Sequence, residues 1–255
     1  MPLLETHKLC VVIGNTRVCD ALDFSLDAGD RCCILGRNGT GKTTLLHTLA
    51  GLRTPTCGDI KLNGQSLQQL PRKRVARYMG LLFQDHSDAF PANVMETVLS
   101  GRHPWMGPFE WESEQDLVLA RAALKSVDLD DMEQRIVTTL SGGERRRLGI
   151  ASLLTQDPQI QLLDEPTNHL DIHHQISMLD LLQQQAEEND RALLFVMHDL
   201  NLALRYCNRF LLLFGDGETV QGTASEVLTH THLERLYQHP LQAVQGPHGT
   251  VWLPQ

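Results

Sequence analysis

Apolar runs of strand length alternate with helical periodicity along the first part of the chain. Arg31–Leu35 is a short apolar run behind a turn, and an amphipathic helical pattern follows from about Lys42 until Gly51 ends it. Polar and apolar residues alternate over Gly58–Gly64, as they do in a half-exposed strand, and Gly80–Gln84 predicts a further buried strand. The pattern predicts an α/β arrangement over roughly the first 85 residues.

The same α/β alternation returns in the last part of the chain, after Pro158. The chain ends in two short β-like stretches around Gly246–Gly249, which predict a small hairpin. The predicted elements are strands over Ile160–Asp164, Ala192–Met197 and Arg209–Phe214, a helix over about Ile172–Glu188, and hairpin strands over Leu241–Val244 and Thr250–Leu253.

Between these two stretches, helical periodicity dominates from about residue 85 to residue 156. It is clearest over Asp116–Val127, where apolar residues recur at i, i+3 and i+4. A loop rich in Pro, Gly and Trp, Gly101–Pro108, lies in the same stretch. We interpret residues 85–156 as a helical subdomain inserted into an α/β core that is formed by residues 1–84 and 157–255.

The composition is that of an ordinary soluble globular protein, with 42% hydrophobic and 21% charged residues. The net charge of −9 argues against non-specific nucleic-acid binding, which requires a basic surface. No apolar run approaches the length of a membrane span, and the first residues lack the features of a secretory signal. If the protein serves a membrane, we expect it to do so through a partner.

The six cysteines show no CxxC spacing, and we expect them to be reduced, mostly buried thiols of a cytosolic protein. Histidine pairs such as His173–His174 and His230–His232 lack a cysteine or carboxylate set at ligand spacing. We therefore interpret them as solvated helix and loop residues and not as metal ligands.

A glycine-rich loop follows the Arg31–Leu35 strand and leads into a helix that opens on Lys42 and Thr43. Glycines let the backbone turn tightly so that successive N–H groups face one anion, and the helix N-terminus adds its dipole. Lys42 supplies a charge for the β- and γ-phosphates, and Thr43 offers a hydroxyl to Mg²⁺. The loop alone does not separate a small-molecule kinase from a GTPase or a transport ATPase. The expected nucleotide-binding residues are Gly36, Arg37, Asn38, Gly39, Thr40, Gly41, Lys42, Thr43 and Thr44.

Two acidic residues lie at the end of the apolar Ile160–Asp164 strand, at the edge where an α/β sheet binds its ligands. Asp164 suits a contact to Mg²⁺, directly or through water, and Glu165 suits the general base that orients the attacking water. An exposed acidic turn before Pro166 is the alternative if this segment is considered alone. Gln161 stands inside the strand where an aliphatic residue is expected, and we expect it to weaken packing more than chemistry.

The segment Leu140–Glu144, Leu-Ser-Gly-Gly-Glu, precedes three arginines and a helix that runs to about Leu154. Ser141 is a good N-cap, and the glycines expose backbone N–H groups at the positive end of the helix dipole. This is a second loop able to bind an anion, about a hundred residues after the first. A capped helix with a basic first turn explains the helix, but it does not explain two such loops together with a carboxylate pair.

These segments, in this order and followed by His198-Asp199, resemble the ATP-binding subunit of an ABC transporter over essentially the whole chain. The resemblance implies an α/β fold, a P-loop NTPase (RecA-like) core with an N-terminal antiparallel β-subdomain and an inserted helical subdomain. It also implies a two-fold, head-to-tail homodimer that sandwiches ATP. In that dimer, ATP held by Lys42 of one subunit is covered by the signature residues of the other, which are Ser141, Gly142, Gly143 and Glu144.

The same resemblance implies roles for single residues, with ATP as substrate and Mg²⁺ as cofactor. Gln84 is the Q-loop residue that contacts Mg²⁺ and senses the γ-phosphate, Asp171 belongs to the D-loop, and His198 is the switch histidine. The expected catalytic residues are Glu165, His198 and Gln84, and the expected metal ligands are Thr43, Gln84 and Asp164. Family members usually stack an aromatic residue on adenine, whereas this chain has Ile13 there, so we expect modest nucleotide affinity and loose base selectivity.

Three longer runs are similar to the ABC branch that imports iron–siderophore, haem and cobalamin, and they are Leu99–Pro104, Asp164–Ile172 and His198–Ala203. This resemblance implies a many-spanning membrane permease as direct partner and a periplasmic or extracellular substrate-binding protein as indirect partner. The subunit is then peripheral, at the cytoplasmic face of the inner membrane. Its cargo is recognised by other chains.

The main alternative is a soluble ABC ATPase of an assembly scaffold, of the iron–sulfur cluster type, with the same ATP chemistry and no membrane partner. The run that begins at His198 argues against it. A translation-type ABC protein is disfavoured because such proteins carry both ATP sites in one chain. A simple kinase leaves the Ser141–Gly143 segment unexplained.

Overall fold

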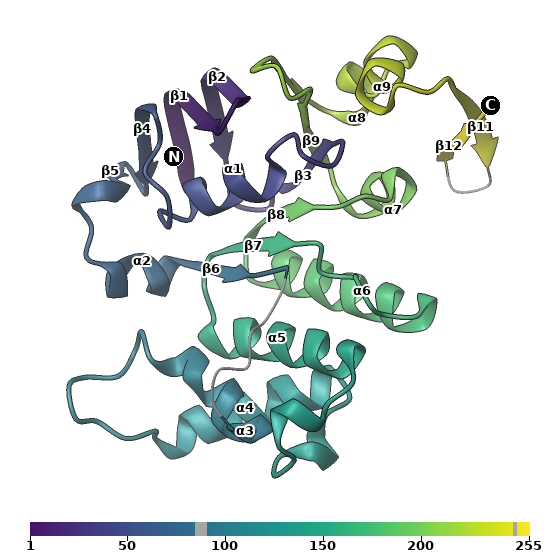
Figure 1. The fold of residues 1–255 in the computed structure, drawn as a ribbon. Helices are drawn as coiled ribbons and strands as arrows, with labels where there is room; N and C mark the ends of the chain where they lie inside the picture. The colour runs from purple at the N-terminus through teal and green to yellow at the C-terminus, as the bar shows by residue number, and fades with distance from the viewer. Residues whose placement is uncertain (85–90, 247–248) are drawn as a thin grey trace. The chain divides into compact units, whose positions relative to one another are not determined.

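The computed structural model describes residues 1–84, 91–246 and 249–255, and the chain divides into two compact units (Figure 1). The first unit contains Met1–Gln69 and Ala192–Gln255, and the second contains Leu70–Arg191. Of the predicted helical subdomain, residues 85–90 lie outside the described residues, and the remainder lies within the second unit. The boundaries 1–84, 85–156 and 157–255 therefore stay a prediction.

An antiparallel sheet forms the N-terminal part of the first unit. In the order in which they pair, its strands are β2 (Thr16–Leu26), β1 (Leu4–Ile13), β4 (Cys57–Leu62) and β5 (Gln65–Ser66). In β1, Leu4, Leu9 and Val11 are buried and exposed residues lie between them, so one face of the sheet packs on the core. The N-terminal antiparallel β-subdomain is therefore confirmed.

The other sheet of the first unit is built on parallel strands. Its central strand β3 (Arg31–Gly36) pairs in parallel with β8 (Ala192–Val196) and β9 (Arg209–Leu213), and β10 (Thr219–Gly222) pairs antiparallel with β9. Every residue of β8 is buried, as expected of a strand covered on both faces. The glycine-rich loop leads from β3 into α1 (Lys42–Leu49), so the predicted strand–loop–helix unit is present.

Three short helices and a hairpin complete the first unit. They are α7 (Leu200–Tyr206), α8 (Ala224–Val227), α9 (His230–Tyr237), and the paired strands β11 (Leu241–Gly246) and β12 (Gly249–Pro254). The predicted hairpin is confirmed, although Pro247 and His248 in its turn lie outside the described residues. Asn201 joins α7 to the hairpin, because its side chain donates to the Trp252 carbonyl (3.2 Å) and accepts from the Trp252 N–H (2.9 Å).

The second unit contains two parallel strands and five α-helices among its described residues. They are β6 (Met79–Leu82), β7 (Ile160–Asp164), α2 (Arg72–Tyr78), α3 (Val94–Leu99), α4 (Glu114–Ser126), α5 (Gly142–Gln156) and α6 (Ile172–Glu188). Within this unit α5 packs against α3 and α4 and also against β6 (Figure 1). Across the described ranges of the chain, no helix has both the length and the apolar character that a bilayer span requires.

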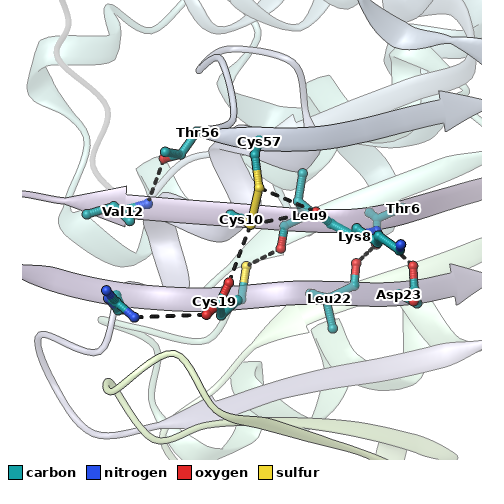
Figure 2. The surroundings of a disulfide bond; sticks show 12 residues. Thr6, Lys8, Leu9, Cys10, Val12, Cys19, Leu22, Asp23, Thr56 and Cys57 are labelled. Carbon is teal, nitrogen blue, oxygen red and sulfur yellow. Dashed lines mark hydrogen bonds and ion pairs between the residues drawn. A yellow bond between two sulfur atoms is a disulfide. The ribbon is translucent and has the colours of Figure 1, made fainter.

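Two cysteines of the antiparallel sheet are joined, which corrects the expectation that all six are reduced. Cys10 of β1 lies opposite Cys57 of β4, and the two form a disulfide with a Cα–Cα distance of 4.9 Å (Figure 2). That distance is within the range a disulfide spans. The sequence hides the pairing because 47 positions separate the two residues. The other four cysteines are buried thiols, as expected, and burial raises the pKa of Cys19 to about 11.

Candidate nucleotide site

The Lys42 side chain lies across the glycine-rich loop of the first unit. Its ammonium group donates to the carbonyl oxygens of Gly36 (2.8 Å) and Arg37 (3.1 Å), and the residue is only 6% exposed. The loop residues Gly36–Thr44 thus surround a fixed positive charge at the first turn of α1, which carries no acidic residue. A loop of this kind attracts a multiply charged anion.

Two glycines of this loop are required by the space around them. At Gly41, with φ of 93°, a Cβ atom would lie 2.4 Å from Cγ2 of Val18. At Gly36 a Cβ atom would lie 2.8 Å from the carbonyl oxygen of Leu213. Because these contacts are shorter than any side chain tolerates, the loop depends on glycine for its path as well as for its exposed N–H groups.

His198 lies at the same sheet edge as the phosphate-binding loop. Ile34 of β3 pairs with Val196 of the parallel strand β8, so Gly36, the last residue of β3, and His198, two residues after β8, lie at the carboxyl ends of neighbouring strands. His198 is exposed, and the next residue, Asp199, caps α7 by accepting from the N–H groups of Asn201 (2.8 Å) and Leu202 (3.0 Å). The residue predicted as the switch histidine therefore lies at the sheet edge from which this loop starts.

In the second unit, the predicted Q-loop glutamine and the predicted general base are in contact. Leu82 of β6 pairs with Leu163 of β7, and the side chains that follow these parallel strands meet. Gln84 Nε2 donates to Glu165 Oε2 over 3.2 Å. Asn168 Nδ2 donates to the same oxygen, a contact that the sequence did not predict. Glu165 is 7% exposed and has a left-handed backbone with φ of 51°, a conformation that recurs at functional sites.

The three residues predicted to bind Mg²⁺ are Asp164, Gln84 and Thr43, and each has a side-chain oxygen. Asp164 is fully buried at the end of β7, and a carboxylate so deeply buried requires positive charge or hydrogen-bond donors beside it. Gln84 lies at the end of the neighbouring strand β6 in the same unit, whereas Thr43 belongs to α1 of the first unit. Carboxylate, carboxamide and hydroxyl oxygens are ligand types that Mg²⁺ accepts, so each residue taken singly is chemically suited to the ion.

The signature segment starts α5 with a complete capping box. Ser141 Oγ accepts from the Glu144 N–H (3.2 Å), and Glu144 Oε2 accepts from the Ser141 N–H (2.6 Å). Arg135 adds an ion pair to Glu144 at 3.1 Å. The Ser141 N–H, followed by the Ser141 hydroxyl and Arg135, holds the pKa of the Glu144 carboxyl below its ordinary value.

A cavity of about 450 Å³ brings the signature segment and the D-loop residue together within the second unit. Asp171 caps α6 by accepting from the His174 N–H (2.9 Å), and this bond holds the pKa of Asp171 below its ordinary value. The cavity is lined by Ser141, Gly142, Gly143, Glu144, Arg147, His169, Leu170, Asp171 and His174. The structure thus joins four predicted signature residues to the predicted D-loop residue.

Ile13 ends β1 and is 36% exposed. Its neighbour Val12 is 42% exposed, so the end of β1 presents aliphatic side chains at the position predicted for the adenine-stacking ring. Aliphatic groups bury apolar area but do not offer the face of a π-system. The predicted departure from the family pattern is therefore a surface feature of the first unit.

Comparison with known proteins identifies the family of the chain. The family described as ABC transporter matches residues 19–168. The chain is 36% identical to the probable siderophore transport system ATP-binding protein YusV of Bacillus subtilis (strain 168), over 97% of this chain and 90% of that protein. It is 38% identical to the hemin import ATP-binding protein HmuV of Nocardia farcinica (strain IFM 10152), over 91% of this chain and 79% of that protein.

The fold is also that of solved ABC proteins. A metal-chelate type ABC transporter in an inward-facing conformation superposes with a TM-score of 0.86 at 29% identity, covering 100% of this chain and 98% of the solved one. The P-loop NTPase fold with an antiparallel β-subdomain and a helical part is therefore confirmed. The chain belongs to the ABC transporter family, as an ATP-binding subunit that hydrolyses ATP.

Proposed function

We propose that this chain is the ATPase subunit of an importer whose cargo is a chelated metal of the siderophore, haem or cobalamin type. The observation that carries the ATPase part is the contact between Gln84 and Glu165. It occurs in a chain that also has two loops suited to bind anions, Gly36–Thr44 and Ser141–Gly143. The cargo class is supported by the siderophore and hemin relatives. Those relatives also disfavour an assembly-scaffold ATPase.

Each side chain of the site has a proposed role in ATP hydrolysis. The loop N–H groups and Lys42 hold the phosphates, and Glu165 orients the attacking water and accepts its proton. His198, exposed at the edge where β3 and β8 end, contacts the γ-phosphate. Thr43, Gln84 and Asp164 would hold Mg²⁺, which neutralises charge on the β- and γ-phosphate oxygens when bound.

A homodimer completes the proposed site. The signature loop lies at the N-terminus of α5, where Ser141 and Gly142 are exposed, so a nucleotide carried by another molecule can reach it. With two-fold symmetry, each signature loop closes over ATP held by Lys42 of the other copy and generates two equal sites.

The permease partner is proposed to contact an aromatic loop of the second unit, residues 103–112. Phe109 is 102% exposed and Trp111 is 88% exposed, with exposed glutamates at positions 110 and 112. The start of the loop is held in place, because Trp105 Nε1 donates to the Gln156 carbonyl (2.8 Å). Exposed aromatic rings beside carboxylates suit a protein surface that offers apolar and basic residues, whereas an anionic membrane surface would repel the carboxylates.

The test uses tagged Glu165→Gln protein, purified with ATP from detergent-solubilised native membranes. We expect a stoichiometric many-spanning permease to copurify, as the proposed peripheral location at the cytoplasmic face of the inner membrane requires. The substrate-binding protein that stimulates this complex would then identify the cargo.

A second variant, Lys42→Ala, tests the phosphate-loop assignment, because it removes the charge expected to hold the phosphates. It should bind ATP at least ~10-fold more weakly, because charged hydrogen bonds to phosphate are among the strong ones. Wild-type ATP affinity in Lys42→Ala would contradict the phosphate-loop assignment. Recovery of Glu165→Gln only from the soluble fraction, with assembly proteins, would favour the scaffold function over import.

A further inference from the structure

Arg146 is the fifth residue of the signature helix α5 and is only 4% exposed. Among the described residues, its guanidinium donates to four backbone carbonyl oxygens of the second unit. Nη1 donates to those of Phe83 and Gln84 (3.4 Å to the latter), Nη2 to that of Asp164, and Nε to that of Pro166 (3.1 Å). The four carbonyls belong to the segments that leave β6 and β7.

These contacts follow from the chemistry of the strand ends. Beyond the last ladder bond, a backbone carbonyl needs a new partner, and a buried carbonyl without one is destabilising. Arginine offers five N–H donors in a planar fork and no acceptor, so one side chain can satisfy several carbonyls at once. Buried guanidinium charge is tolerated here because carbonyl oxygens face it from both segments.

The position of these carbonyls connects Arg146 to the reacting groups. Phe83 and Gln84 form the exit of β6, and Asp164 and Pro166 flank the predicted base. Gln84 and Glu165 themselves are joined by the 3.2 Å side-chain bond. Holding both backbone segments with one planar group therefore determines how far the Gln84 amide lies from the Glu165 carboxylate.

We propose that Arg146 is a positioning residue for ATP hydrolysis that connects the signature helix to the Q-loop and to the general base. Glu144, two residues earlier in α5, belongs to the capping box, so a displacement of the signature segment would reach Gln84 and Glu165 through Arg146. The inference rests on the proposed function of Glu165. It adds a residue that acts through the backbone of Gln84 and of the segment around Glu165.

The neighbouring arginines make different contacts. Arg145 donates to the Leu140 carbonyl, and Arg147 donates to the carbonyls of Val127 (2.7 Å) and Asp128 (3.1 Å). Among the described residues, Arg146 donates to the carbonyls of Gln84 and Pro166, which follow β6 and β7. The contacts of the middle arginine are therefore the ones that carry the proposal.

The test compares Arg146→Met, which removes all donors but keeps the apolar stem, with Arg146→Lys, which keeps the charge but not the planar fork. The control is Arg191→Gln. Arg191 is 9% exposed and pairs with Asp157, the cap at the opposite end of α5. For each full-length variant, kcat, KM and ATP affinity are measured together with the melting temperature.

We expect kcat of Arg146→Met to fall at least ~10-fold with ATP affinity within about threefold of wild type, because small displacements of catalytic groups are costly. The kcat of Arg146→Lys should lie between that of Arg146→Met and that of wild type. Arg191→Gln should lower the melting temperature but keep kcat within about twofold. If Arg146→Met does not fold, a lowered kcat in Arg146→Lys at an unchanged melting temperature supports the proposal.

The proposal is overturned if both Arg146 variants keep wild-type kcat, or if kcat in Arg191→Gln falls in parallel with stability as it does in Arg146→Met. Wild-type protein that hydrolyses no ATP would instead refute the proposed function. The two failures are therefore distinguishable within one experiment.

Discussion

Gln84 and Glu165, which are 81 positions apart, share a hydrogen bond of 3.2 Å between the side-chain amide and the carboxylate. The bond fixes the direction of the carboxylate that we propose as the base. Asn168 donates to the same oxygen from the turn after β7. Two amides therefore hold one oxygen of Glu165.

Gln84→Ala tests this relationship. Removing the amide should lower kcat about 10-fold or more, because a hydrogen bond to a charged group contributes about 1.5–3 kcal/mol. The matched control is Gln183→Ala, since Gln183 donates to Glu187 (2.8 Å) on the exposed face of α6. Steady-state phosphate release measures both. Equal rates in the two variants would show that the Gln84 bond does not contribute to catalysis.

Ile13→Tyr should improve nucleotide binding. A ring at the end of β1 can stack on adenine, and a stacked aromatic pair adds about 0.5–1.5 kcal/mol beyond area burial, so ATP affinity should rise about fivefold. Ile13→Leu is the control for side-chain size. Competition binding with ATP and GTP measures both affinity and selectivity. If the unmodified protein already bound ATP at least ~10-fold more tightly than GTP, the expectation of loose base selectivity would be wrong.

Gln161→Leu should stabilise the protein. Gln161 is fully buried in β7, and both polar atoms of its side chain lack a hydrogen-bond partner among the described residues. Replacing them with an apolar group of similar size should raise the free energy of unfolding by about 1–3 kcal/mol.

The opposite change is expected at Gln156, which donates to the carbonyls of Ala76 (2.7 Å) and Met79 (3.1 Å). Gln156→Leu should therefore lower the free energy of unfolding. Urea denaturation of both variants makes the comparison. A loss of stability in Gln161→Leu would mean that this amide makes a favourable interaction after all.

Acid should destabilise the capping box that Glu144 and Ser141 form at the start of α5. The pKa of Glu144 is lowered in the folded state, so its stabilising contribution is complete above the unfolded value of about 4.3 and is lost as pH falls through the lower folded value. Glu144→Gln keeps an acceptor for the Ser141 N–H but carries no charge. Its melting temperature should therefore fall less than that of wild type between about pH 5 and pH 3.

Glu234→Gln, which changes an exposed carboxylate on α9, is the control for the loss of one negative charge. It should show the same acid dependence as wild type. An identical slope of melting temperature against pH in all three proteins would remove Glu144 as a source of acid sensitivity.

Most of the nucleotide site could be predicted from sequence because its chemistry is local. A strand, three glycines and Lys42 follow one another, and the carboxylates at 164 and 165 end an apolar run. Hydrophobic periodicity likewise predicted α4 and α6, since each buries one face. Ser141 was predicted as an N-cap, but the pairing with Glu144 was missed although the Ser-x-x-Glu spacing is its signal.

Contacts between distant segments could not be predicted in this way. Cys10 and Cys57 meet only because β1 pairs with β4, and the sequence shows no spacing that marks this register. The Arg146 contacts are a second case, because a row of three arginines does not reveal which guanidinium is buried. Asn168 beside Glu165 is a third, since the left-handed turn that brings them together has no glycine to mark it.

The closeness of the signature glycines to the D-loop segment has an evolutionary consequence. A Cβ atom at position 143 would lie 3.2 Å from the carbonyl oxygen of His169, and one at position 142 would lie 3.5 Å from the His169 Cβ. Selection for packing alone would therefore oppose a larger residue at position 143. A paralogue that had stopped hydrolysing ATP would still be expected to retain that glycine. In a divergent sequence, a glycine at position 143 is therefore weaker evidence of ATPase activity than a glutamate at position 165.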